Sequence, residues 1–481
     1  MSGGTVPSLD ELLESRSRRP RILVLAISVG CSLGLGITAL VHLIPPRPYG
    51  IADDFRVFYA AATMLTRARS PYSAGALRAT EQLVWHYGHL QANLDLYAYL
   101  PVTATLLEPL TKLPFWVAYT LYTMVGFGVA GLVISLVARD LGWRHDRILV
   151  ATVLTSWVAL LGALSGNLDL LLLASIGGGM LLSWRGHPFF AGLVLGVIWV
   201  KPDVAWPAAV FLILALWPQR GLLLRFAAGF SLTSLVFLLV GLARMGAWWA
   251  AVVRFGHTIA GGQYDLAGLP SLAAAAPRSW GLHPGLLQPG TLAVLGLGLV
   301  AMLALALWML TSPDWSRLTL VGRITWAVAL GMGVWLVVTP YAHTNDDLLL
   351  VFLLMLTVGR DARRVHGLGL WLSLAVVTML LLVWPAGLVP WEVALLALLA
   401  TSAALWWHRT DPRLTGFGAA LALLSVALLP GVAPFHLLLV SLTPVAGLVL
   451  LVEGCRTCWL ELGGAGTGPA YAGEVAPAGD W

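Results

Sequence analysis

The sequence predicts an all-α polytopic membrane protein, and its composition and the form of its apolar runs both support that fold class. Of the 481 residues, 59% are hydrophobic and only 11% are charged, whereas soluble domains carry about 25% charged residues. The apolar residues form unbroken runs such as "LAVLGLGLVAMLALALWML", and these lack the alternation of a transmembrane β-barrel. Because helices satisfy their own backbone hydrogen bonds in lipid, they are the spanning elements that such runs favour.

A spanning helix needs about 20 apolar residues, and on this basis we expect about 12 to 14 membrane helices, some of them broken or re-entrant. The first apolar run follows "RSRRPR" and is too long for the apolar part of a signal peptide, so we expect an uncleaved first helix. The predicted spans are residues 22–44, 115–138, 148–164, 168–184, 189–200, 203–217, 222–242, 290–311, 324–339, 345–359, 366–385, 389–407, 415–429 and 435–453.

The basic residues of the short connections predict a cytoplasmic N-terminus. With this orientation, 18 of the 28 Lys and Arg residues lie on the inner side. Most of the others lie in or beside two long outer segments, residues 45–114 and 243–289, and long segments cross the membrane largely regardless of charge. We therefore expect a multi-pass protein of the plasma membrane. Its polytopic domain comprises residues 1–458, and the Gly-, Ala- and Pro-rich residues 459–481 form a disordered cytoplasmic tail.

The first outer segment contains two predicted interfacial elements. In "DFRVFYAAATMLTRA", residues 54–68, the side chains of Phe55, Phe58, Tyr59 and Ala62 recur at helical spacing, which predicts an amphipathic helix on or in the membrane interface. Residues 97–119 are apolar and interrupted by prolines, which predicts a second interfacial or re-entrant stretch.

A third local pattern is the GxxxG formed by Gly192 and Gly196 in a predicted span. Small residues at this spacing allow two membrane helices to pack closely.

Polar and ionisable residues concentrate at the predicted outer ends of the helices. Because ionisable groups at membrane depth are costly, such residues are a functional hypothesis by default. The residues are Asp53, Asp54, Asn167, Asp169, Lys201, Asp203, Tyr341, His343, Asn345, Asp346 and Asp347.

Several of these residues also have structural alternatives. Asp53 and Asp54 could cap the interfacial helix. Lys201 could extend from a helix end to the interface. Asp346 and its neighbouring aspartate could bind a metal together with His343.

Several common chemistries find no support in the sequence. The pI near 9.3 does not indicate nucleic-acid binding, because the basic residues lie in short clusters between apolar runs. There is no G-x-x-x-x-G-K-[ST] phosphate loop and no G-x-S-x-G or H-E-x-x-H motif. Cys455 and Cys458 form a single CxxC, which supplies two of the four ligands of a structural zinc site. We expect an inert thiol pair, and a redox or metal role is the alternative.

Four segments in the same order resemble glycosyltransferase family 87, the polyprenyl-phosphate-mannose-dependent mannosyltransferases of the GT-C class. The first, "DDFRVFYAAATMLTRARSPY", is similar to the first outer loop of the family, with Asp54, an aromatic pair, an Ala-Ala helix and a Pro-Tyr. The others are "LYAYLPVTATLLEPLTKLP", "SGNLDLLLLAS" followed by "AGLVLGVIWVKPDVAWP", and "TPYAHTNDDLLL". The chain departs from the family at 166–169, where Gly-Asn-Leu-Asp replaces Gly-Gln-x-Asn, and at "YAHTNDD", so the identity of the sugar stays open.

The resemblance implies a GT-C-type bundle with interfacial helices in the first outer loop. It also implies a glycosyltransferase that moves a sugar, mannose in this family, from a polyprenyl-phosphate donor to a lipid or glycan acceptor at the outer face, with inversion. Asp54 would be the general base, while His343 and Lys201 would stabilise the leaving phosphate. No cofactor and no metal are expected, because these cations neutralise the charge. The remaining residues expected at the substrate are Asp53, Tyr59, Tyr99, Asn167, Asp169, Asp203, Tyr341 and Asp346.

Two alternatives remain open from the sequence. A lipid-linked-sugar flippase or permease would also need many helices and charged groups in the membrane. Carriers of that kind place polar groups near the midplane and often contain internal repeats, whereas here the polar groups lie at helix ends and no repeat is visible. The second alternative is a GT-C enzyme that transfers another sugar.

Overall fold

The structure is a computed structural model, and the part of the chain that it describes is helical, with connecting segments and no strand. This confirms the predicted all-α class. The described residues are 52–85, 97–141, 150, 153–154, 157–260, 289–339, 346, 348–353, 356, 451, 455, 458 and 462. The first predicted span and the predicted spans beyond residue 359 lie outside these ranges, so the total number of membrane helices stays a prediction. The division into a polytopic domain and a tail also stays one.

Four helical stretches in the described part are long and apolar enough to cross a membrane. They are Phe115–Asp140, Arg220–Phe255, Pro289–Thr311 and Leu320–Val338. The first is α5, the third is α14 and the fourth is α16. The second stretch comprises α11 (Arg220–Gly241), η3 (Leu242–Arg244) and the first eleven residues of α12 (Met245–Ala260). Shorter apolar helices pack between them: α7 (Trp157–Ser165), α8 (Asp169–Trp184), α9 (Pro188–Leu195), η2 (Gly196–Val200) and α10 (Pro202–Leu216).

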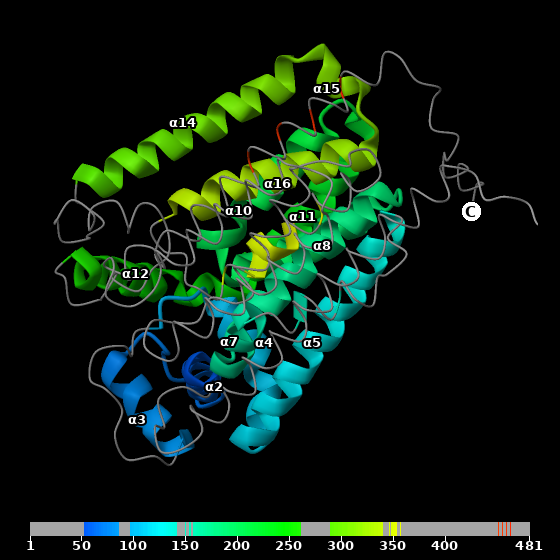
Figure 1. Ribbon diagram of the computed structural model, residues 1–481. Helices are drawn as coiled ribbons and strands as arrows, with labels where there is room; N and C mark the ends of the chain where they lie inside the picture. Colours follow the sequence, from blue (N-terminus) through cyan, green and yellow to red (C-terminus); the bar gives the residue numbers. More distant parts are fainter. Residues whose placement is uncertain are drawn as a thin grey trace, which may run out of the picture.

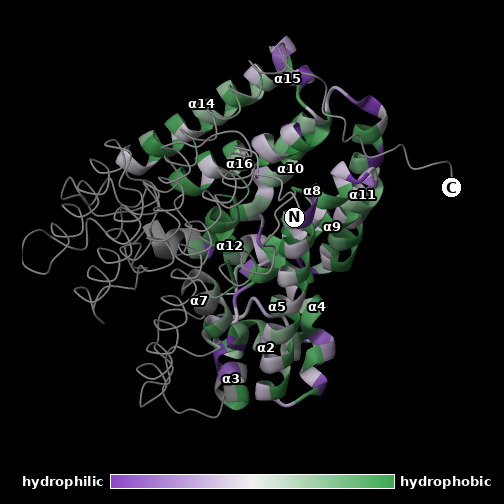
Figure 2. Cartoon of the chain, turned by 45° about the vertical axis from the view of Figure 1, so that its right-hand side comes forward, coloured by the Kyte–Doolittle hydropathy of each residue, from purple (hydrophilic) through white to green (hydrophobic). Residues whose placement is uncertain are grey.

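The long helices expose apolar side chains, as a protein in a lipid bilayer requires. Met124 of α5, Leu224 of α11 and Leu297 of α14 are among the exposed large hydrophobic residues, and Figure 2 shows hydrophobic colouring along these helices. By contrast, α16 is mostly buried. It lies between α10 and α14 (Figure 1), so it forms the centre of this part of the bundle.

Hydrogen bonds at the two ends of the bundle fix the directions of the helices. Near the start of α10, the backbone carbonyl of Asp203 accepts a hydrogen bond from Trp335, close to the end of α16. At the other end, Ala215 of α10 accepts one from Arg323 of α16. These two helices are therefore antiparallel. As a consequence, the start of α10 and the end of α16 meet at the same end of the bundle.

Glycines set the closest helix crossing, between α9 and α11. A Cβ atom on Gly192 would collide with the backbone of α11 at Phe226, and a Cβ atom on Gly229 would collide with the carbonyl oxygen of Phe189. A Cβ atom on Gly196 would meet the side chain of Thr233. The predicted close packing at the GxxxG pattern is therefore confirmed, and its partner on the facing helix is Gly229.

The described residues of the predicted first outer segment form a small helical cap at one end of the bundle (Figure 1). Its elements are α2 (Asp53–Thr66), α3 (Ala74–Trp85), α4 (Pro101–Leu107) and η1 (Glu108–Lys112). The predicted helix over 54–68 is confirmed as α2, and residues 101–112 form α4 and η1. The interfacial position of α2 and the interfacial or re-entrant character of the stretch after residue 97 stay predictions. The apolar face of α2 is buried against protein, since Phe55 packs on Phe115 at the start of α5. A buried ion pair between Arg56 and Glu81, with an N–O distance of 3.2 Å, joins α2 to α3.

Arg323 directly precedes the predicted span 324–339, yet it lies inside a helix. The helix α16 begins at Leu320, four residues before the predicted span, so Arg323 lies inside the helix and is buried. Its guanidinium donates hydrogen bonds to the carbonyl oxygens of Ala215, Ser316 and Leu318. These bonds satisfy carbonyl groups near the end of α10 and in the connection before α16, a use of Arg that is common at helix C-termini.

Candidate functional site

The carboxylate of Asp54 is held at the N-terminus of α2. The helix begins at Asp53, and its N-cap is Ala52, which has a left-handed backbone and no side-chain capping bond. The backbone N–H of Ala52 donates to the carbonyl oxygen of Leu164 at the end of α7, with an N–O distance of 2.5 Å. Because an alanine is the N-cap, neither aspartate occupies the N-cap position itself. A carboxylate in the first turn is still stabilised by the helix dipole.

The side chain of Asp54 meets Asn167, which precedes α8. The Asn167 Nδ2 atom donates to Asp54 Oδ2 at 2.8 Å. The backbone of Asn167 is anchored as well, because its N–H donates to the carbonyl oxygen of Gly162 and its carbonyl oxygen accepts from the Tyr122 hydroxyl at 2.9 Å. Asn167 therefore links the cap, α5 and α8 at one point.

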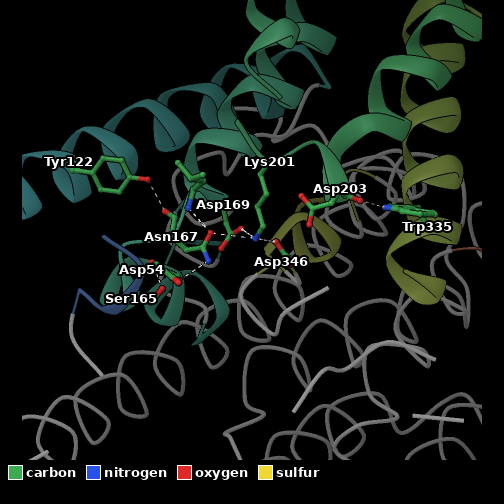
Figure 3. A network of polar contacts seen from close by, with 11 residues as sticks. Asp54, Tyr122, Ser165, Asn167, Asp169, Lys201, Asp203, Trp335 and Asp346 are labelled. Carbon is green, nitrogen blue, oxygen red and sulfur yellow. Dashed lines mark hydrogen bonds and ion pairs between the residues drawn. The ribbon is translucent and has the colours of Figure 1, made fainter. Parts of the chain in front are cut away.

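Lys201 occupies the break between η2 and α10. The residue before a proline is disfavoured in the α conformation, and Pro202 is the first residue of α10, so the chain bends at Lys201. This bend directs the side chain into the bundle, where Lys201 is only 2% exposed. Its ammonium contacts Asp169 Oδ1 at 3.2 Å, Asp346 Oδ1 at 2.5 Å and Asn167 Oδ1 at 3.4 Å. Figure 3 shows these groups converging from separate segments.

Two further predicted residues flank this cluster. Asp203 lies in the first turn of α10 with an exposed side chain, on the opposite side of Lys201 from Asn167 (Figure 3). Tyr99 lies in the connection before α4, and its ring packs edge-on against Phe58 of α2 with ring centroids 4.8 Å apart. Tyr99 is close enough to interact electrostatically with Asp54.

Tyr59 lies apart from this cluster. It is buried against Phe115, and its hydroxyl donates to the backbone of Leu113 at 2.7 Å. Burial raises the pKa of Tyr59 above its ordinary value, so the hydroxyl stays a neutral donor.

The structure thus brings together five residues that the sequence had placed at the same predicted side of the membrane: Asp54, Asn167, Asp169, Lys201 and Asp346. The predicted residues Tyr341, His343, Asn345 and Asp347 and the side chain of Asp53 lie outside the described residues. Within the described part, no group of three or more His, Cys, Asp or Glu residues could hold a metal ion.

Two contributors were missed from the sequence. Tyr122 holds Asn167 from α5, and Trp335 donates its indole N–H to the backbone of Asp203 at 2.8 Å. Both are amphipathic aromatic residues. Tyr122 lies two turns into its predicted span, whereas Trp335 lies near the end of its own, where such residues concentrate. That position is a signal for the membrane interface, but it does not reveal which polar group the hydroxyl or the indole reaches.

These features define the class: an all-helical, polytopic membrane protein with a carboxylate and a buried ion cluster at one end of its bundle. The chain belongs to glycosyltransferase family 87, whose model matches residues 97–340, just over half of the chain. It is therefore a membrane glycosyltransferase, and the family predicted from the sequence is confirmed. The matched range includes Asn167 and Lys201 but not Asp54, His343 or Asp346. No curated protein and no solved structure matches the chain.

Proposed function

We propose that this glycosyltransferase transfers mannose from a polyprenyl-phosphate donor to a lipid or glycan acceptor at the outer face of the membrane. The observation that supports this most directly is the Asp54 carboxylate, half-buried at the start of a cap helix and hydrogen-bonded to Asn167 from the bundle. A donor with a prenyl tail presents its sugar where a membrane bundle meets its cap. The cluster at helix ends, rather than midway along the helices, favours an enzyme over a carrier.

In the proposed mechanism, Asp54 acts as the general base. Its carboxylate takes the proton of the acceptor hydroxyl while that oxygen forms a bond to the anomeric carbon. The bond from that carbon to the phosphate oxygen breaks at the same time, so the configuration inverts and polyprenyl phosphate leaves with the electron pair. General base catalysis typically contributes about 10²–10⁴-fold. We place Asp53 and Tyr99 around the sugar, and Tyr341 and Asp203 at the rim of the same site.

The leaving phosphate needs a cation or hydrogen-bond donors. The sequence offers His343 and Lys201 for this role, but three side chains already accept from the Lys201 ammonium. We therefore assign the stabilisation of the phosphate to His343. A positive imidazole in a site of low dielectric stabilises developing charge strongly.

The test is transfer by the purified full chain in proteoliposomes, with polyprenyl phosphates carrying labelled mannose, glucose or arabinose and a lipid extract of native membranes as the acceptor. We expect mannose transfer by the wild type, about 10²–10⁴-fold less by Asp54→Asn, and a fall in turnover for His343→Ala. Asp314→Asn, at an exposed residue of α15 (Pro313–Arg317), is the matched control. Near wild-type transfer by Asp54→Asn would exclude Asp54 as the base, and transfer of another sugar alone would overturn the mannose assignment.

A further inference from the structure

All three N–H donors of the Lys201 ammonium have acceptors within the described cluster. A lysine ammonium carries three N–H donors and no acceptor, and three side-chain oxygens accept here, from Asn167, Asp169 and Asp346. The two carboxylates are 1% and 0% exposed. With two negative groups and one positive group, the formal charge of this trio is minus one. A phosphate that approached Lys201 would therefore meet a buried ammonium whose charge is already more than balanced.

The same ammonium and the backbone N–H of Leu168 together set the orientation of the Asn167 side chain. Asn167 Oδ1 accepts from the backbone N–H of Leu168 at 2.6 Å and from Lys201 Nζ at 3.4 Å. With the oxygen held on that side, the Nδ2 atom faces Asp54 Oδ2, to which it donates at 2.8 Å. The reversed amide would bring its NH₂ group against two donors and its oxygen against a carboxylate. Each of these contacts is repulsive, so only one orientation satisfies all partners.

We propose that Lys201 is a positioning residue that acts on Asp54 through Asn167, and that it does not bind the phosphate of the donor. Asp169 and Asp346 hold the ammonium in place, the ammonium and the Leu168 N–H hold the amide, and the amide positions and stabilises the ionised carboxylate of Asp54. A hydrogen bond to a charged group is stronger than a neutral one. This inference rests on the proposed role of Asp54 as the base.

The decisive measurement is the acid limb of the pH profile of kcat/KM, with labelled polyprenyl-phosphate mannose as the donor. Asn167→Ala removes the donor to Asp54, which makes the ionised base harder to form. We expect its acid limb to move to higher pH by about one unit, the size expected for one hydrogen bond to a charged group. Among the described titratable groups, Tyr99 and Tyr122 interact electrostatically with Asp54. The adjoining ion cluster contains Lys201, Asp169 and Asp346, and Asp203 flanks it.

The variant that isolates Lys201 is the double substitution Lys201→Met with Asp346→Asn. It removes the ammonium and one carboxylate together, so the formal charge of the cluster stays at minus one. It also avoids leaving two unpaired buried carboxylates, which would endanger folding. We expect an upward shift of the acid limb that is no larger than in Asn167→Ala, because the backbone N–H of Leu168 still holds the amide oxygen, with KM for the donor within about twofold of the wild type. When Asn167→Ala is added, we expect no shift beyond that of Asn167→Ala alone, because residues that act through one another are not additive.

A direct contact between Lys201 and the donor phosphate would give a different result. If Lys201 contacts the phosphate, the double substitution will raise KM for the donor about tenfold or more, as expected for one lost charge-assisted contact. Its effect will then add to that of Asn167→Ala, and the acid limb will stay in place. A raised KM, an additive effect or an unmoved acid limb would each overturn the positioning role. If instead Asp54→Asn keeps its activity, the proposed function itself has failed, so the two failures are distinguishable.

Should the double substitution not fold, Asn167→Asp provides the second test. It keeps the size of the side chain and replaces the donor with a carboxylate facing Asp54. We expect an acid limb shifted further than in Asn167→Ala, because two like charges in contact disfavour ionisation. An unshifted limb in this variant would contradict the proposal.

Discussion

Replacing Gly229 with alanine should loosen the crossing that carries Lys201 to the site. Gly229 lies on α11 where it meets α9, and α9 continues through η2 directly to Lys201. A Cβ atom at this position would collide with the carbonyl oxygen of Phe189 and lie 3.1 Å from the backbone nitrogen of Leu193. Because the contact atoms are backbone, no side-chain rotation can relieve the collision, and α9 itself must move.

The expected magnitude follows from two opposing terms. Extra atoms forced into a packed interface cost about 1–3 kcal/mol. Replacing a glycine in a helix with alanine returns about 0.5–1 kcal/mol, because the unfolded chain loses freedom and the helix gains propensity. We therefore expect Gly229→Ala to lower the free energy of unfolding by up to about 2.5 kcal/mol. Gly221, on the same helix, has nothing within 4 Å of an added Cβ atom, so Gly221→Ala should raise stability by about 0.5–1 kcal/mol.

The assay is thermal and denaturant unfolding of the purified full chain in one detergent, followed by circular dichroism, with the transferase assay run in parallel. We expect opposite signs for the two variants and a loss of turnover in Gly229→Ala alone. If Gly229→Ala is as stable as Gly221→Ala, the crossing is not as close as the structure places it. If Gly229→Ala is destabilised but turns over normally, the crossing does not position Lys201.

Three further predictions concern the rest of the described chain. Arg323→Met should lower the free energy of unfolding by about 3 kcal/mol, because three carbonyl groups lose a charged donor. The control Arg317→Met removes an exposed ion pair with Asp314 and should change this free energy by less than about 1 kcal/mol. Denaturant unfolding measures both. Arg56→Met should cost about 3–5 kcal/mol by removing the cation of its buried ion pair with Glu81, and adding Glu81→Leu should recover most of that loss, which thermal unfolding measures. The raised pKa of Tyr59 means that its neutral form stabilises the fold below about pH 10 and that this contribution is lost as the pH rises above it. Tyr59→Phe should therefore weaken the alkaline loss of stability, and an unchanged alkaline transition would contradict this.

Helix positions in this chain could be predicted closely from sequence. The predicted span at 290–311 is α14 (Pro289–Thr311), and the span at 203–217 is α10 (Pro202–Leu216). The start of α16 was missed by four residues because Arg323 interrupts the apolar pattern. Its charge is accommodated by carbonyl groups of other segments, which the hydropathy of one window does not reveal.

The candidate site could be predicted as a set of residues but not as a network. Proline after Lys201 and acidic residues after the first apolar run identified the positions, since these patterns are local. The pairing is not local: Asn167 and Asp54 lie 113 residues apart, and Lys201 and Asp346 lie 145 residues apart. The sequence therefore could not show whether the lysine faces a phosphate or two carboxylates.

By itself, the sequence determined that this chain is a helical membrane protein and where its described helices run, because lipid requires long apolar segments whose backbones bond internally. Only the tertiary structure decided that Lys201 is enclosed by Asp169, Asp346 and Asn167, and that Asn167 turns its amide toward Asp54. The physical reason is that a buried charge must find its counter-charge through packing, and packing joins segments that are distant in the chain.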